Sequence, residues 1–197
     1  MDKHFTLLAL GDSYTIGEAV DENQRWPIQL KLLLASKGII LNEIDIIAKT
    51  GWTTDELKAA IDDKNITAKY DYVSLLIGVN NQYRGYPLEN YKNEFKQLLD
   101  MAIGFASGNT KNVIVLSIPD WGAMPFAEGK DRADIGHKID AFNASNKTIS
   151  DSAGVHYVDV TPISRMAIND KSLVALDGLH PSGKMYAMWA AELAGLF

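Results

Sequence analysis

The chain has 197 residues, of which 47% are hydrophobic and 22% are charged, and this composition is typical of one domain around one continuous core. Its net charge of −6 argues against nucleic-acid binding, which requires a basic face. The absence of cysteine excludes disulfides, thiolate catalysis and cysteine-held metal ions.

The first half of the chain reads as apolar runs that alternate with amphipathic or polar segments. Residues 5–10 predict a strand, and because it follows the first few residues directly, no signal peptide is visible and a cytoplasmic location is expected. No apolar run is long enough for a transmembrane segment. We expect the following elements: a polar loop at 11–23, a helix from Trp26 to Gly38, a strand at 39–48, a helix capped by Thr53 or Thr54 and ending near Lys64, and a strand at 70–78.

The second half continues the alternation. We expect a loop at 79–86, a helix from about 87 to 106, a strand at 112–118, a long loop at 119–136, a helix at 138–153, a strand at 155–160, a turn at 177–181 and a closing helix at 182–196. The inner face of the 87–106 helix carries Tyr91, Phe95, Leu98 and Leu99. Strands that alternate with helices predict an α/β fold with a five-stranded parallel sheet and right-handed crossovers. No linker or repeat interrupts the pattern, so we expect a single domain over residues 1–197.

Four short polar sites follow predicted strands or lie in the last turn. They are Gly11-Asp12-Ser13, Thr50-Gly51, Gly78-Val79-Asn80 and Asp177-Gly178-Leu179-His180. Parallel strands all point the same way, so the loops that follow them share one edge of the sheet. These sites are remote in sequence, and the topology predicts that they converge in space.

The residue types at these sites match one reaction. A serine hydroxyl needs a base to remove its proton during nucleophilic attack, and His180 is placed to serve Ser13 in this way. Asp177, three residues before His180, is placed to orient the ring and stabilise its charged form. The backbone amides of Ser13 and Gly51 and the side chain of Asn80 are three donors for the developing oxyanion.

Each of these residues also has an ordinary structural interpretation when it is taken alone. Asp12 and Ser13 suit a turn or a helix cap, His180 an exposed turn, Asp177 the start of a turn and Gly51 a turn glycine. Asn80 can satisfy backbone groups within its own loop. The occurrence of all these residues together, at strand ends, favours the catalytic interpretation.

The same blocks resemble those of the SGNH hydrolase superfamily, also called the GDSL lipases and esterases. Gly11-Asp12-Ser13-Tyr14, Thr50-Gly51, Gly78-Val79-Asn80 and Asp177-Gly178-Leu179-His180-Pro181 match its four blocks in order. The resemblance implies a flavodoxin-like three-layer α/β/α sandwich, Ser13 as nucleophile, Asp177 and His180 as acid and base, and Ser13, Gly51 and Asn80 as the oxyanion hole. The chain departs from the family pattern at Tyr14, where Leu is frequent, and at Asn81, where Asp is frequent.

Other chemistries find less support. The Gly11 loop lacks the spacing of the known phosphate-binding glycine motifs, which disfavours nucleotide or flavin binding. No metal-ligand spacing is present, so neither a metal nor another cofactor is expected. A catalytically silent flavodoxin-like binding module remains an alternative, although intact Ser13, Asp177 and His180 argue against it.

The substrate is less defined by the sequence than the reaction. We expect a small-molecule ester with a short acyl chain; the resemblance also allows acetylated carbohydrates, lysophospholipids and thioesters. Trp121, Met124 and Phe126 either line a substrate pocket or pin the long loop onto the core. Tyr83 and Arg84 follow Asn80 closely, and Arg84 either binds an anionic part of the substrate or faces solvent. The oligomeric state is not indicated.

Overall fold

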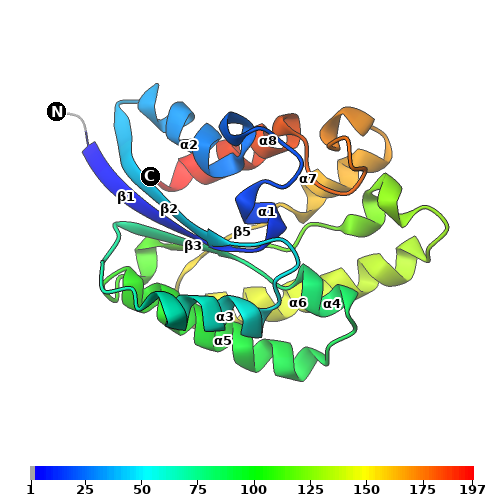
Figure 1. The fold of residues 1–197 in the computed structure, drawn as a ribbon, viewed down its shortest axis with the longest axis horizontal. Helices are drawn as coiled ribbons and strands as arrows, with labels where there is room; N and C mark the ends of the chain where they lie inside the picture. Colours follow the sequence, from blue (N-terminus) through cyan, green and yellow to red (C-terminus); the bar gives the residue numbers. More distant parts are fainter. Residues whose placement is uncertain (1–2) are drawn as a thin grey trace.

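The computed structural model describes residues 3–197, which form a five-stranded parallel sheet with the order β2-β1-β3-β4-β5 (Figure 1). The strands are β1 (Lys3–Gly11), β2 (Ile39–Ala48), β3 (Tyr72–Leu76), β4 (Val113–Leu116) and β5 (His156–Val158). The register aligns the carboxyl ends of the first three strands, since Gly11 pairs with both Ala48 and Leu76. The segments that leave these three strands therefore begin side by side.

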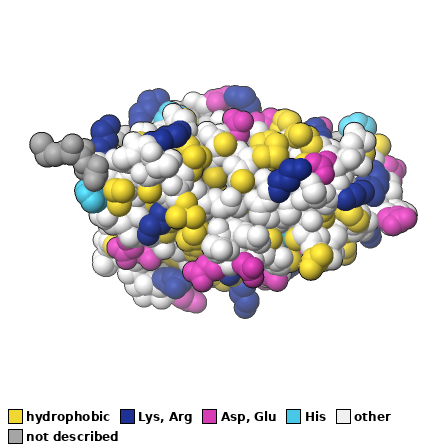
Figure 2. Space-filling view, turned by 90° about the horizontal axis from the view of Figure 1, so that it is seen from above, with side chains coloured by type: hydrophobic (Ala, Val, Ile, Leu, Met, Phe, Trp, Pro, Cys, Tyr) yellow, Lys and Arg dark blue, Asp and Glu magenta, His cyan; other side chains and the backbone are white. Residues whose placement is uncertain are grey.

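Helices cover both faces of the sheet and make it the middle of three layers (Figure 1). One face carries α1 (Ser13–Ile16), α2 (Trp26–Ala35), α7 (Thr161–Arg165) and α8 (Gly183–Leu193), and the other carries α3 (Thr54–Lys64), α4 (Val79–Tyr83), α5 (Leu88–Phe105) and α6 (Arg132–Ala153). Within residues 3–197, none of the helices combines the length and apolar character that crossing a bilayer requires. Figure 2 looks onto the α2 and α8 face, where Lys and Arg side chains are dispersed among apolar and acidic ones.

The central strands explain why the sheet is covered on both sides. All five residues of β3 and all four of β4 are buried, as is the run from Leu7 to Leu10 in β1. Such continuous apolar runs are typical of parallel strands with helices on both faces. Trp26 on α2 and the Tyr91 and Phe95 side chains on α5 complete one contiguous core around them.

The predicted fold class is confirmed, and the strand at 39–48 has the predicted bounds. Thr53 is the cap of α3, with Glu56 completing a capping box, and the helix ends at Lys64 as expected. Tyr91, Phe95, Leu98 and Leu99 are buried on α5, also as expected.

Several predicted loops contain helical structure. The 11–23 segment holds α1 and a 3₁₀ turn at Glu22–Gln24, and the 79–86 segment holds α4. Helix α6 begins at Arg132 rather than at 138, because the Asp131 side chain caps the helix by accepting from the Asp134 amide. The 119–136 loop also contains 3₁₀ turns at Trp121–Ala123 and Pro125–Ala127. Apart from α6, the elements in these loops have only three to five residues, so apolar periodicity is too weak to mark them.

Candidate active site

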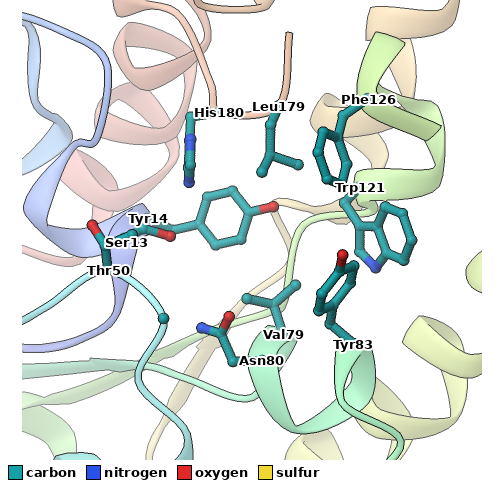
Figure 3. A pocket seen from close by; sticks show the side chains of 11 residues that line it. Ser13, Tyr14, Thr50, Val79, Asn80, Tyr83, Trp121, Phe126, Leu179 and His180 are labelled. Atoms are coloured by element: carbon teal, nitrogen blue, oxygen red, sulfur yellow. The ribbon is translucent and has the colours of Figure 1, made fainter. Parts of the chain in front are cut away.

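A cavity of about 180 Å³ opens at the carboxyl edge of the sheet, where the predicted polar sites meet (Figure 3). Its lining comes from segments far apart in the sequence: Ser13, Tyr14, Thr50, Gly51, Val79, Asn80, Tyr83, Trp121, Phe126, Leu179 and His180. Ser13, Gly51, Asn80 and His180 were all singled out from the sequence, and the structure brings them to this one cavity. Tyr14, Thr50, Val79 and Leu179 were not proposed as lining residues, although each adjoins one that was.

Ser13 occupies the first turn after β1. Gly11 has to be glycine here, because a Cβ at this position would lie 2.5 Å from the Leu76 carbonyl oxygen of the neighbouring strand. Asp12 then caps α1, its Oδ1 accepting from the Tyr14 amide at 3.0 Å, and the helix starts at Ser13. The capping role anticipated for Asp12 is therefore present, and it presents Ser13 to the cavity with only 5% of that residue exposed.

Asp12 is also an unusual carboxyl group. It is completely buried, and its Oδ2 atom has no hydrogen-bond partner among the described residues. Burial raises the pKa of Asp12 to about 7, against the opposing effect of the hydrogen bond from the Tyr14 amide. A carboxyl group whose pKa is raised by burial therefore directly precedes Ser13.

Tyr14 stands where the resembling family frequently has Leu. Its ring is buried and meets the His180 ring edge-on, with centroids 5.7 Å apart. It also packs against Trp189 of α8 in a tilted arrangement, with ring centroids 6.3 Å apart. Edge-to-face aromatic contacts like that with His180 are favourable. Tyr14 thus supports the His180 ring from the core. The two residues are far apart in the sequence, so no sequence pattern indicates this contact.

His180 and Asp177 are joined through their side chains. Asp177 Oδ2 lies 2.5 Å from His180 Nδ1, while its Oδ1 accepts from the amides of Leu179 at 2.9 Å and His180 at 3.0 Å. Partial burial opposes ionisation of Asp177, but these hydrogen bonds together keep its pKa below the ordinary value. The bond at Nδ1 leaves Nε2 as the free ring nitrogen of a histidine that lines the cavity.

Backbone hydrogen bonds to neighbouring segments hold the Asp177–His180 turn in place. The Ala175 amide donates to the His180 carbonyl at 2.8 Å, and the Ser182 amide donates to the Leu173 carbonyl at 2.8 Å. The Gly178 carbonyl accepts from the Phe126 amide at 2.9 Å, which ties the turn to the long loop after β4. Figure 3 shows the His180 ring directed toward Ser13, although within residues 3–197 no hydrogen bond joins the two side chains. Such bonds are often long in ligand-free sites.

Gly51 and Asn80 lie on the opposite wall. Gly51 follows β2 with φ of +87°, a backbone conformation that favours glycine. Asn80 lies in the first turn of α4, and its Nδ2 donates to the Trp52 carbonyl at 2.9 Å, which leaves the second N–H of this amide unassigned. Gly78, before α4, has φ of +128°, and a Cβ there would lie 2.6 Å from the Tyr91 ring. The entry to α4 therefore depends on glycine.

Asn81 replaces the acid that is frequent in the resembling family, and the structure shows its contacts. Its Oδ1 accepts from the Thr54 amide at 3.1 Å, and its Nδ2 donates to the Thr54 hydroxyl at 2.7 Å. That hydroxyl in turn donates to the Glu94 carboxylate. An amide fits this position because it donates and accepts at once, whereas a carboxylate only accepts. Asn81 thus braces α4 against the start of α3.

Of the five residues proposed from the sequence to contact substrate, three line the cavity and two do not. Tyr83, Trp121 and Phe126 line the cavity, with Tyr83 and Trp121 ring centroids 5.3 Å apart and Trp121 held by a 2.7 Å bond from its Nε1 to Gln82. Met124 lies in the core, fully buried, and does not line the cavity. Arg84 does not line it either: its guanidinium group bonds the Gly51 carbonyl.

The model of the GDSL-like lipase/acylhydrolase family matches residues 9–188. The chain belongs to this family. The match spans the segments that carry all of the cavity residues described above, and it identifies the chain as a hydrolase of the esterase type.

Solved structures, two of them of proteins named as esterases, share the fold of this GDSL-family chain. Axe2, an acetylxylan esterase from Geobacillus stearothermophilus, superposes with a TM-score of 0.76 at 19% identity over 99% of this chain and 94% of its own. TesA superposes with a TM-score of 0.73 at 18% identity over 97% of both chains. The psychrotrophic esterase EstA from Pseudoalteromonas sp., solved with monoethylphosphonate as inhibitor, has a TM-score of 0.70 at 16% identity over 96% and 94%. A comparison with curated proteins finds no match.

Proposed function

We propose that this chain hydrolyses carboxylic esters with small or short acyl groups, through an acyl-enzyme formed on Ser13. The observation that carries the proposal is the arrangement of His180. Its Nδ1 is bound to Asp177, so its free Nε2 belongs to a ring that shares one cavity with the Ser13 hydroxyl. A nucleophile, a base and a carboxylate that orients the base are the parts that acyl transfer needs.

In the first half of the reaction, the Ser13 Oγ forms a bond to the ester carbonyl carbon while its proton passes to His180 Nε2. The carbonyl π electrons move to oxygen and form a tetrahedral oxyanion. Collapse of this intermediate breaks the bond to the alcohol oxygen, which takes the proton from His180 as it leaves. Asp177 keeps the tautomer correct and stabilises the charged ring between these steps.

Each of the three proposed donors has an N–H available for the oxyanion. Within residues 3–197, neither the Ser13 amide nor the Gly51 amide donates to a protein acceptor, and both residues line the cavity. The Asn80 side chain contributes the N–H that its bond to Trp52 leaves free. Donors of this kind act most strongly when they are fixed before the charge develops. In the second half, water replaces the alcohol and the same steps release the acid.

The size and lining of the cavity favour a substrate with a short acyl group. Its volume is about 180 Å³, and its far side is formed by the aromatic rings of Tyr83, Trp121 and Phe126. A rigid aromatic wall suits an apolar acyl or aryl group and limits its length. A second candidate, deacetylation of a carbohydrate, is favoured by the exposure of Tyr83 and Phe126, 53% and 43%, because exposed rings are surfaces on which sugars can stack. The acetylxylan esterase named above shares the fold with this chain.

The test compares the wild-type protein with Ser13→Ala on aryl esters of increasing acyl length and on acetylated xylo-oligosaccharides. We expect Ser13→Ala to lower kcat by at least about 1,000-fold, because the nucleophile is removed, with an unchanged thermal unfolding midpoint. Ser152→Ala, an exposed serine on α6, is the matched control and keeps the wild-type rate. Wild-type rates in Ser13→Ala would contradict the mechanism. A protein without esterase activity would return the silent binding module to consideration.

A further inference from the structure

Arg84 is exposed, as one of its two sequence interpretations expected, but its guanidinium group also makes contacts within the protein. It caps the carboxyl end of α4, and its Nη2 donates to the Gly51 carbonyl at 2.6 Å, 33 residues away in the sequence. Its Nη1 lies 3.4 Å from Glu56 Oε2. The guanidinium group therefore joins the end of α4 to the loop after β2 and to the start of α3.

The backbone of Gly51 needs contacts with other segments to fix its conformation. Glycine is required by its positive φ, yet glycine is also the residue with the greatest backbone freedom. The amide proposed to bind the oxyanion and the carbonyl bound by Arg84 both belong to Gly51. The two groups lie in adjacent peptide planes that meet at the Gly51 Cα, so a hydrogen bond to the carbonyl limits the changes in ψ by which the loop could turn the amide away from the cavity.

Helix α4 holds this loop at two consecutive carbonyls. Arg84 binds the Gly51 carbonyl, and Asn80 binds the Trp52 carbonyl at 2.9 Å. The Arg84 amide also donates to the Asn80 carbonyl at 3.0 Å, so the two residues are linked within α4. The side-chain donor and the backbone donor of the proposed oxyanion hole consequently form one hydrogen-bonded frame.

Glu56 anchors the other end of this frame. Its Oε2 accepts from the Thr53 amide at 2.9 Å as part of the α3 capping box. A planar guanidinium group can donate to a carbonyl and a carboxylate at the same time in a fixed geometry, which the single ammonium group of lysine does not reproduce. Because the Arg84 side chain is 38% exposed, its ion pair with Glu56 contributes little stability by itself. Its role lies in where it holds the Gly51 carbonyl.

We propose that Arg84 is a positioning residue that aligns the Gly51 amide with the Asn80 side chain for oxyanion binding. This inference rests on the proposed ester hydrolysis. Arg84 does not line the cavity, and both of its terminal nitrogens have partners in the protein, so it is not placed to bind an anionic substrate.

The first experiment measures kcat and KM for wild type, Arg84→Met and Arg84→Lys on a neutral aryl acetate and on an anionic aryl hemisuccinate. We expect Arg84→Met to lower kcat about 10- to 100-fold on both esters, somewhat less than the loss of an oxyanion donor itself, with KM changed less than about two-fold. The kcat of Arg84→Lys should lie between those of the wild type and Arg84→Met. Lys92→Met is the matched control, since it removes an exposed cation that pairs with Glu89 on α5, and it keeps wild-type values.

The second experiment places Arg84→Met in an Asn80→Ala background. If both residues serve one oxyanion frame, the second substitution lowers kcat much less than it does in the wild-type background, by at most about three-fold. Independent, multiplicative losses would overturn the proposal. A KM increase confined to the anionic ester would also overturn it, in favour of substrate binding.

The Ser13 and Arg84 variants separate the positioning role of Arg84 from the hydrolytic mechanism. If Ser13→Ala abolishes hydrolysis while Arg84→Met and Arg84→Lys retain the wild-type kcat, only the positioning role is wrong. If Ser13→Ala itself retains activity, the hydrolytic mechanism is wrong and this role with it. Should Arg84→Met not fold, Arg84→Lys carries the test, because a wild-type kcat in that variant contradicts the requirement for a forked donor.

Discussion

The two walls of the candidate site are built in different ways. The wall that carries Ser13, Gly51 and Asn80 consists of segments that leave three adjacent strands, and its supporting residues, Asp12 and Asn81, are completely buried. The wall that carries Asp177 and His180 is a turn away from the sheet, in which the Asp177 side chain is 34% exposed and Leu176 is fully exposed. One wall is positioned by strand register and the other by local hydrogen bonds.

This difference predicts where substitutions have their effect. On the strand-built wall, the backbone that places the donors is also part of the core, so a change in that backbone affects stability and activity together, whereas loss of the Ser13 hydroxyl alone affects only activity. On the turn, the hydrogen bonds of Asp177 orient the base, and these bonds involve no core residue, although the Tyr14 ring packs against His180 from the core. A change there affects activity alone.

The largest effect is expected on the turn. Asp177→Asn should lower kcat by about 1,000- to 10,000-fold, because an amide cannot hold the His180 tautomer or stabilise its charged form. The Asn oxygen still accepts from the Leu179 and His180 amides, so the turn and the unfolding free energy change little. Steady-state kinetics and urea unfolding measure the two quantities. Asp170→Asn, which alters an exposed carboxylate paired with Lys184, is the control, and a similar loss in both variants would contradict the account.

The next effect is expected on the strand-built wall and concerns stability. Gly78→Ala should lower the unfolding free energy by about 3 kcal/mol or more, because its Cβ meets the buried Tyr91 ring and Ile118 at 2.6 and 2.8 Å. Tyr91 cannot retreat easily, since its hydroxyl lies within hydrogen-bond distance of both the Ile77 carbonyl and the Asn146 side chain. Gly85→Ala, also at positive φ but with open space around it, should cost only about 1 kcal/mol. Equal losses in urea unfolding would show that the α4 entry is not constrained as described.

The smallest expected effect is the pH dependence of stability that Asp12, on the strand-built wall, produces. Asp12 has its pKa raised to about 7 from an ordinary value of 3.8, so between these values the folded protein binds a proton that the unfolded chain has lost. Stability therefore falls as pH rises through this window, and Asp12→Asn, which cannot ionise, escapes that part of the decrease. Relative to wild type, the variant should gain up to about 3 kcal/mol between pH 5 and pH 8.

Urea unfolding at several pH values measures the Asp12 effect. Asp21→Asn, at an exposed position whose side chain makes no capping bond, is the control and should follow the wild-type curve. If Asp12→Asn follows the wild-type curve as well, the Asp12 carboxyl is ionised throughout and the buried site tolerates its charge.

The sequence predicted best what depends on long apolar runs and on strand ends. The 39–48 strand is rich in β-branched residues, and its bounds agree with the structure. The polar sites at 13, 51 and 80 follow strands that lie side by side, so the topology alone brings them to one edge. The roles proposed for these residues in catalysis remain predictions, as does the extent of the domain.

What the sequence did not predict depends on contacts between distant segments. Helix α4 has no apolar periodicity of its own, and it forms because Gly78 turns the chain and Asn81 bonds to Thr54. The partner of Arg84 is a backbone carbonyl on another segment, for which no residue pattern exists. Segment 161–176 consists of α7 and two 3₁₀ turns, Met166–Ile168 and Lys171–Leu173, which are too short to leave a periodic signal.

The most direct measurement of the central claim is a crystal structure of the protein after reaction with an alkyl phosphonate that mimics the tetrahedral intermediate. The account predicts a single covalent adduct on Ser13 Oγ. One phosphonyl oxygen should lie within about 3.1 Å of the amides of Ser13 and Gly51 and of Asn80 Nδ2, and His180 Nε2 should lie beside the Ser13 oxygen. An adduct on another residue, or a phosphonyl oxygen directed away from all three donors, would contradict it.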